Sequence, residues 1–140
     1  MENNINDIIK YIGKRYGTFD PFVLADMLNI EVHWADIYPR PYGDTSYIDG
    51  QPIVLLANHI KDSNQKYFVL AHELGHVIRH EGLAAYYIAN DYNRLKAENE
   101  ADKFALSLIT HLYVEEVGAS PHSYRELRNM YGAPDIGNVD

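Results

Sequence analysis

No cysteine occurs among the 140 residues of this chain. This absence excludes a disulfide framework and every metal site built on thiolates. Any metal ion must therefore be held by histidine and carboxylate side chains, a ligand set that is typical of catalytic rather than structural sites. The chain has 7 histidines and 20 acidic residues that could supply such ligands.

The sequence also lacks an apolar run long enough to cross a membrane. Its first residues, Met1-Glu2-Asn3-Asn4, do not show the basic and then apolar character of a signal peptide. Together with the lack of cysteine, these features predict a cytoplasmic protein that does not enter the membrane.

Basic residues are few, because 12 lysines and arginines stand against 20 acidic residues and give a net charge of −8. Nucleic acids are bound largely through clustered lysine and arginine, and the sequence shows no basic patch. We therefore expect no direct contact with nucleic acid. The sequence leaves two interpretations of the acidity open. It either favours docking of a protein partner with a basic face or only keeps the protein soluble.

The composition, with 46% hydrophobic and 23% charged residues, is that of an ordinary globular protein. The length fits a single domain, residues 1–140, and is too short for two sizeable cores. Within it we expect a core at about 5–112, a short C-terminal helix at about 121–131 and a loose tail at 132–140.

The N-terminal part predicts two short helices followed by a strand. Apolar residues recur at helical spacing from Ile5 to Tyr16, and Asp20-Pro21 is a typical N-cap followed by a first helical residue. Residues 30–34 alternate apolar and polar side chains, which indicates a half-buried strand. The two helices could form a DNA-binding helix-turn-helix, but they are poor in lysine and arginine, so a packing role is favoured. The second helix is expected to pack through Val23, Leu24, Met27 and Leu28.

A hairpin is predicted next. Residues 47–48 and 53–56 are mostly apolar and flank Asp49-Gly50, a strong hairpin signal, whereas residues 35–46 have the proline and glycine of a loop. With the strand at 30–34, the hairpin predicts a small antiparallel sheet of about three strands. The remaining pattern is helical, so the predicted fold class is α+β, mostly helical.

Three further helices are predicted after the hairpin. Asp62 or Ser63 can cap the first, which ends near Gly82. The second spans about 93–112 with an apolar stripe along one side, and the third is the short helix at 121–131.

The first of these helices carries the most informative pattern in the chain, His72-Glu73-Leu74-Gly75-His76, or H-E-x-x-H. Residues four apart on a helix differ by about 40° in direction and about 6 Å in height. His72 and His76 can therefore share one metal ion, with Glu73 beside them as a carboxylate base. Such an arrangement is typical of zinc hydrolases. Gly75 costs a helix about 0.5–1 kcal/mol relative to alanine, which indicates close approach of another element or of substrate.

Two histidines leave a catalytic zinc site one protein ligand short. The helix at 93–112 offers Glu98, Glu100 and Asp102. At about 100° per residue, Glu98 and Glu100 flank the apolar stripe on opposite edges, and Asp102 points further away. Helical geometry alone does not choose among them, and without the upstream motif all three would be read as a solvated acidic face.

Two stretches resemble the ImmA/IrrE-type metallopeptidases. Residues 65–80 are similar to that family's Q-x-x-F-x-x-A-H-E-L-G-H-x-x-x-H, and residues 99–105 are similar to its N/E-E-A-N/D-x-F-A. The order of two helices, a strand, a hairpin ending in Ala57-Asn58 and the histidine-bearing helix also resembles the family's peptidase domain, over about 5–112. The chain departs from the family's L-L-x-P at residues 106–110, which read L-S-L-I-T.

The resemblance implies a compact zincin-like fold and a zinc-dependent endopeptidase. In this family the glutamate directly before the alanine is the third ligand, so the resemblance implies that His72, His76 and Glu100 bind Zn²⁺. Glu73 is then the catalytic base, which takes a proton from water and passes it to the leaving amine. The resemblance, and not the helical geometry, selects Glu100.

The resemblance also implies a biological role. Proteins of this type occur in phages, mobile elements and bacterial genomes, and those characterised cleave a helix-turn-helix repressor. The expected partner is therefore a DNA-binding repressor encoded nearby. The alternative is a zinc-binding regulatory module that binds a repressor or antitoxin without cleaving it, but a pure binder does not need Glu73. A housekeeping peptidase is disfavoured because little chain remains for a second, substrate-binding domain.

The remaining candidates are less specific. His80 continues the histidine face by one turn, where it either contacts substrate or, as we favour, only lies near the helix C-terminus. A donor is needed to stabilise the oxyanion of the tetrahedral intermediate. Candidates for that donor are Tyr86, Tyr87, Tyr92 and His111.

Overall fold

A computed structural model describes residues 2–80 and 91–135, with side chains described for 5–78 and 95–135. Two helices, α1 (Glu2–Tyr16) and α2 (Pro21–Met27), precede the strands β1 (Glu31–Ala35), β2 (Gly43–Ile48) and β3 (Gln51–Ala57). A short 3-10 helix, η1 (Asn58–Ile60), then leads to α3 (Gln65–His80), α5 (Asp91–Val117) and α6 (Tyr124–Tyr131). The α+β class predicted from the sequence is confirmed.

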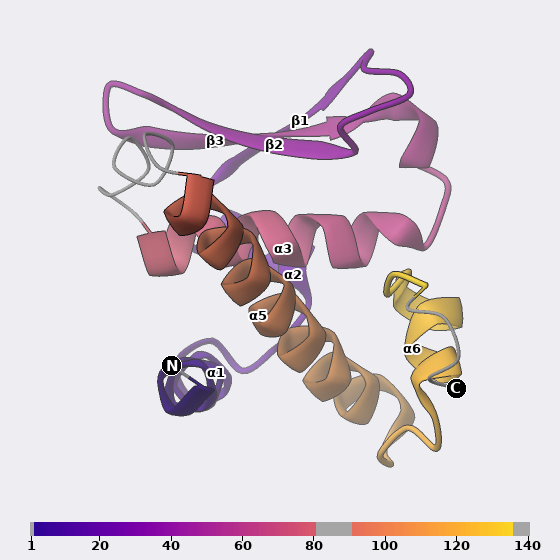
Figure 1. Cartoon of the computed structure of the whole chain (residues 1–140). Helices are drawn as coiled ribbons and strands as arrows, with labels where there is room; N and C mark the ends of the chain where they lie inside the picture. The colour runs from indigo at the N-terminus through magenta and orange to yellow at the C-terminus, as the bar shows by residue number, and fades with distance from the viewer. Residues whose placement is uncertain (1, 81–90, 136–140) are drawn as a thin grey trace.

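The elements form layers with α3 at the centre. Figure 1 shows the sheet above α3 and α5 running obliquely across α3 and downward, with α1 beside α5 and α6 below the N-terminal end of α3. A hydrophobic core joins the layers. Among its most deeply buried side chains are Ile9, Leu24, Val54, Leu56, Leu70, Leu74, Phe104 and Leu108. Because α3 packs against both the sheet and α5, side chains of the sheet and of α5 can both contact residues of α3.

The sheet has the strand order β1-β3-β2 and is mixed. Val54 of β3 lies opposite Val32 of the parallel strand β1 and opposite Thr45 of the antiparallel strand β2. The prediction of an antiparallel sheet is therefore corrected, because the hairpin returns β3 between the other two strands. The most apolar strand, β3, thus takes the central position, and the more polar β2 lies at an edge.

Strand β2 begins at Gly43, inside the stretch 35–46 that was predicted to be a loop. Its first two residues, Gly43 and Asp44, are of types that are depleted in strands, so the start of the strand was not predicted from the sequence. Burial nevertheless alternates along β2, with Gly43, Thr45 and Tyr47 half-buried and the intervening residues exposed. The half-buried positions face α3. The predicted hairpin turn is confirmed at Asp49 and Gly50, which have φ of 52° and 82°.

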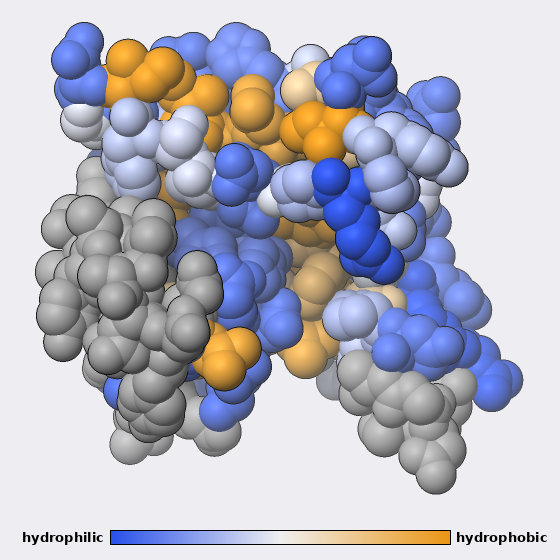
Figure 2. Space-filling view, turned by 45° about the horizontal axis from the view of Figure 1, so that its top comes forward, coloured by the Kyte–Doolittle hydropathy of each residue, from blue (hydrophilic) through white to orange (hydrophobic). Residues whose placement is uncertain are grey.

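The other face of the sheet is open to solvent. Ile48 of β2 is 60% exposed there. Figure 2 shows hydrophobic surface gathered along the top of the view, over the sheet. Within the described residues, no helix has both the length and the apolar character that crossing a bilayer requires.

The first two helices pack as predicted, with one correction. Asp20 caps α2 by accepting a 2.9 Å hydrogen bond from the Phe22 backbone N–H. Leu24 and Ala25 carry the packing of α2, whereas Val23 and Met27, predicted to be packing residues, are 41% and 53% exposed. The short helix turns these two residues toward solvent.

The later helices differ from prediction mainly at their ends. The Gln65 N–H bonds to Ser63 Oγ at 3.0 Å, so Ser63 caps α3, while the predicted end at Gly82 lies outside the described residues. Helix α5 continues to Val117, beyond the predicted end at 112, and stops before Gly118, whose φ is 89°.

Helix α6 starts at Tyr124, later than the predicted 121, and ends at Tyr131, before Gly132, whose φ is 72°. The first part of the tail predicted to be loose packs against the fold. Ala133 is only 2% exposed, and the Tyr124 hydroxyl donates to the Pro134 carbonyl at 2.6 Å. Residues 136–140 lie outside the described part of the chain.

Candidate metal centre

Helix α3 holds the H-E-x-x-H motif between the two layers. Leu70, Ala71 and Leu74 are fully buried and fix the helix in the core. His72 and His76 lie on the side of α3 that faces α5, and their side chains are 15% and 19% exposed. The histidines are therefore anchored on a rigid element and still partly accessible.

Gly75 explains how closely α5 approaches this helix. A Cβ atom at Gly75 would lie 3.2 Å from the Ala101 Cα and 3.1 Å from Cδ1 of Phe104. Both distances are shorter than ordinary van der Waals contact, so a larger residue at this position would require α5 to move away by a few tenths of an ångström. The predicted close approach at Gly75 is confirmed, and the approaching element is α5.

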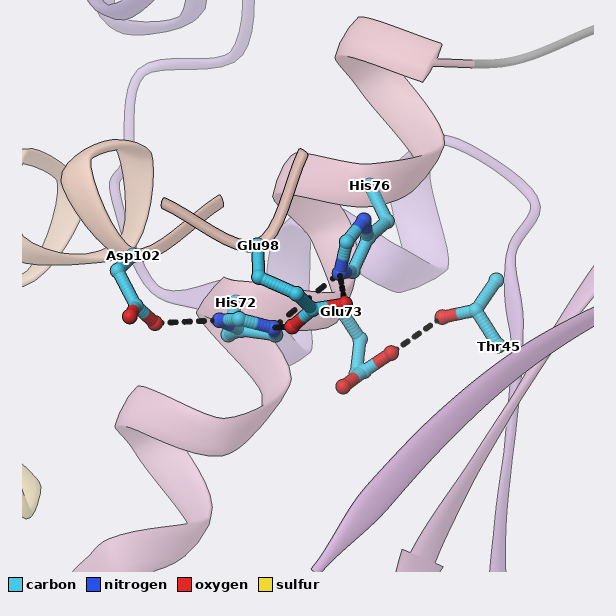
Figure 3. Close-up of polar contacts among 6 residues, drawn as sticks. All are labelled: Thr45, His72, Glu73, His76, Glu98 and Asp102. Atoms are coloured by element: carbon cyan, nitrogen blue, oxygen red, sulfur yellow. Dashed lines mark hydrogen bonds and ion pairs between the residues drawn. The ribbon is translucent and has the colours of Figure 1, made fainter. Parts of the chain in front are cut away.

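At this crossing, Glu98 of α5 meets both histidines (Figure 3). Its Oε1 lies 2.9 Å from His72 Nε2 and its Oε2 lies 3.1 Å from His76 Nε2. The two Nε2 atoms are 3.2 Å apart. Ligand atoms bound to one tetrahedral zinc ion at about 2.0–2.1 Å lie about 3.3 Å apart. The three side chains therefore fit a single metal ion both in chemistry and in spacing.

Glu100, the predicted third ligand, is not in this cluster. It is 6% exposed, whereas the Glu98 side chain is 50% exposed. Residues two positions apart on a helix differ by about 200° in direction, so Glu98 and Glu100 lie on different sides of α5. Glu98 is therefore the carboxylate that the structure brings to both histidines, and the assignment of the third ligand to Glu100 stays a prediction.

Asp102, one of the three acidic candidates for the third ligand, makes a contact that was not predicted from the sequence. Its Oδ1 accepts a 2.7 Å hydrogen bond from His72 Nδ1, on the opposite side of the ring from Glu98 (Figure 3). Such a bond fixes the ring orientation and leaves Nε2 directed toward the metal position. The sequence contained an indication of this contact. Asp102 follows Glu98 by four residues, and residues four apart lie on the same side of a helix.

The electrostatics reflect these contacts. Burial lowers the pKa of His72, but hydrogen bonds to Asp102 and Glu98 outweigh it and raise the pKa to about 10. Hydrogen bonds from His72 and His76 lower the pKa of Glu98 well below its ordinary value. In the metal-free protein, an imidazolium and a carboxylate therefore occupy the positions from which a cation would be held.

Glu73 lies on the other side of α3, facing the sheet. It is 7% exposed, and its Oε1 accepts a 2.6 Å hydrogen bond from Thr45 Oγ1 of β2. Burial raises the pKa of Glu73, while the bond from Thr45 and the nearby His72 and His76 act to lower it. A raised carboxyl pKa suits a group that must accept and then release a proton near neutral pH. Sequence reasoning missed Thr45 because it placed the residue in a loop.

The predicted oxyanion donors are not brought to the site within the described residues. His111 donates from Nδ1 to the Ser107 carbonyl at 2.8 Å, and its ring packs against Phe19 at a centroid distance of 5.0 Å. The side chains of His80, Tyr86, Tyr87 and Tyr92 lie outside the part of the chain with described side chains.

Comparison with known proteins agrees with this geometry. No curated protein and no solved structure matches the chain. A family model, described as the IrrE N-terminal-like domain of peptidase family M78, matches residues 25–132. This range contains the sheet and every residue of the cluster, including Thr45, His72 and Glu98. The match covers more than half of the chain. Together with the H-E-x-x-H motif on α3 and the position of Glu98 on α5, it establishes that the chain belongs to the peptidase M78 family of IrrE N-terminal-like domains.

Proposed function

We propose that the protein is a zinc-dependent endopeptidase that cleaves a helix-turn-helix transcriptional repressor. The observation that carries the catalytic part is the convergence of His72, His76 and Glu98, with Glu73 next to His72 in the chain. Membership of a peptidase family supports the same conclusion.

The donor set defines how a metal ion would be held. Neutral His72 and His76 each supply Nε2, and ionised Glu98 supplies a carboxylate oxygen, while Asp102 orients the His72 ring. Two imidazoles and one carboxylate are a common ligand set of catalytic zinc. When bound, zinc supplies Lewis acidity, which lowers the pKa of water and polarises a peptide carbonyl.

Glu73 performs the proton transfers in this proposal. As a carboxylate, it accepts a proton from the water that attacks the scissile carbonyl carbon. As a carboxylic acid, it then donates that proton to the amide nitrogen as the C–N bond breaks. The products are an amine and a carboxylic acid, the new acid passes its proton to the amine or to solvent, and Glu73 returns to its ionised form.

The substrate class rests on the resemblance to ImmA/IrrE-type peptidases and on charge. A DNA-binding repressor carries a basic face, and this chain carries a net charge of −8. Opposite charges favour the encounter of the two proteins, with an effect that salt reduces.

The direct test mixes the purified, zinc-loaded protein with purified helix-turn-helix repressors encoded near its gene. We expect discrete repressor fragments, resolved by gel and mass spectrometry, that disappear when a chelator is added. The matched variant is Glu73→Gln, which keeps the shape of the side chain and removes the base. It should still bind zinc but lose cleavage.

Each other outcome has a distinct meaning. A stable complex without cleavage would favour the binding module over the enzyme. Degradation of casein to many fragments would favour a broad-specificity peptidase. Full activity of Glu73→Gln would show that the proposed proton transfer is wrong.

A further inference from the structure

The contact between Thr45 and Glu73 joins two layers of the fold. Thr45 lies on the edge strand β2 and Glu73 on α3, 28 residues later, and their oxygens are 2.6 Å apart. Thr45 lies on the half-buried face of its strand, between the exposed Asp44 and Ser46. The hydroxyl is therefore directed at the carboxylate by the strand backbone.

Strand β2 also confines the aliphatic part of Glu73. A Cβ atom at Gly43 would lie 3.3 Å from Glu73 Cγ and 2.7 Å from Cγ1 of Val69. The side chain of Glu73 thus packs directly against strand backbone at Gly43, two residues before Thr45. Both the stem and one carboxylate oxygen of Glu73 are held by the same strand.

The type of residue at position 45 matters for this contact. Threonine is β-branched, so its χ1 angle is restricted and its hydroxyl is a stiff donor. A bond from a neutral hydroxyl leaves the carboxylate charged, and it occupies only one of the two oxygens. The second oxygen stays available to accept a proton.

We propose that Thr45 is a positioning residue that holds Glu73 in the orientation needed for proton transfer. This inference rests on the proposed function, in which Glu73 is the base. A general base must lie within hydrogen-bond reach of the proton that it takes, and small displacements of such groups are costly. The edge strand therefore contributes to catalysis through Thr45 without touching the metal ligands.

The test compares Thr45→Val, which keeps the shape and removes the donor, with Thr45→Ser, which keeps the donor. With the repressor substrate, kcat of Thr45→Val should fall about tenfold to a hundredfold, the range expected for losing a hydrogen bond to a charged group. KM and zinc affinity should remain unchanged, and Thr45→Ser should recover most of the lost kcat. The matched control is Ser46→Ala, which removes a hydroxyl from the exposed face of the same strand and should behave as the wild type.

A wild-type kcat in Thr45→Val would overturn the inference, whereas cleavage by the wild type and its loss in Glu73→Gln would still support the peptidase. A fall in zinc affinity parallel to kcat would also overturn it, because the role would then be structural.

A second measurement does not depend on turnover. The free energy of unfolding of metal-free protein is measured for the wild type, Thr45→Val, Glu73→Ala and the double variant. The effect of Thr45→Val should be large when Glu73 is present and small when it is absent. Additive effects would show that the contact does not hold Glu73. If the wild type cleaves none of the substrates, the proposed function fails. The comparison of these four unfolding free energies, a double-mutant cycle, then decides by itself whether Thr45 holds Glu73.

Discussion

On its α5 side, helix α3 presents His72 and His76 to charged groups, whereas on its β2 side it presents Glu73 to a neutral hydroxyl. The α5 side is half-open, since the Glu98 side chain is 50% exposed. The β2 side is closed, since Glu73 is 7% exposed. Figure 3 shows the two sets of contacts on either side of the same helix.

The difference follows from helical geometry. Consecutive residues on a helix differ by about 100°, so His72 and Glu73 must be supported by different neighbours. Helix α5 supplies acidic groups that suit the binding of a cation and the orientation of its ligands. Strand β2 supplies one hydroxyl donor that suits the positioning of a base. Metal binding and proton transfer should therefore be separable by mutation.

The largest expected effect concerns the α5 side. Glu98→Gln removes the negative charge and replaces the carboxylate by a weakly coordinating neutral amide, so zinc affinity should fall by more than about 100-fold. Glu100→Gln, two residues away and outside the cluster, should keep wild-type affinity. Competition with a chromophoric chelator measures both. Loss of zinc in the Glu100 variant with retention in the Glu98 variant would return the third ligand to Glu100.

The second-largest effect is expected from the hydrogen bond between His72 Nδ1 and Asp102, which also lies on the α5 side of α3. Asp102→Ala leaves His72 Nδ1 without its acceptor, so zinc affinity should fall about 10-fold to 100-fold, as is typical for partners of metal-bound histidines. Asp102→Asn, whose amide oxygen can still accept the bond, should lose less. Equal affinities in all three proteins would show that the bond does not orient His72 for metal binding.

Zinc binding should depend on pH through His72. Its pKa is raised to about 10 in the metal-free protein, and only the neutral imidazole binds metal. Zinc must therefore displace a proton below that pH, and affinity should rise by about tenfold per pH unit between pH 7 and 9. Calorimetry in buffers of different ionisation enthalpy measures the released proton. Absence of proton release would show that His72 is already neutral.

The smallest effect concerns the β2 side. In Gly43→Ala, the new methyl group would lie 2.7 Å from Cγ1 of Val69 and 3.3 Å from Glu73 Cγ, so the strand must move away from α3. We expect kcat to fall about threefold to tenfold as Glu73 shifts, with zinc affinity unchanged. Steady-state cleavage and chelator competition check the two parts. A parallel loss of zinc would mean that the two sides are coupled.

Much of the fold could be predicted from local sequence patterns. The α+β class, the cap at Asp20 and the turn at Asp49-Gly50 depend on residues close in sequence, and all are confirmed. The parallel pairing of β1 with β3 and the start of β2 at Gly43 were not predicted. Both depend on which strands meet across the sheet, and the first residues of β2, Gly43 and Asp44, have low strand propensity.

For the site, the sequence by itself determined that His72 and His76 share one face and that Glu73 is their neighbour, because the helix repeat fixes those directions. It also indicated that another element or substrate comes close to Gly75. Only the tertiary structure decided that Glu98 and Asp102 reach the histidines, because packing of Ala101 and Phe104 against Gly75 sets the rotation of α5. Only the tertiary structure placed Thr45 beside Glu73, because that contact joins two layers whose meeting no local pattern encodes.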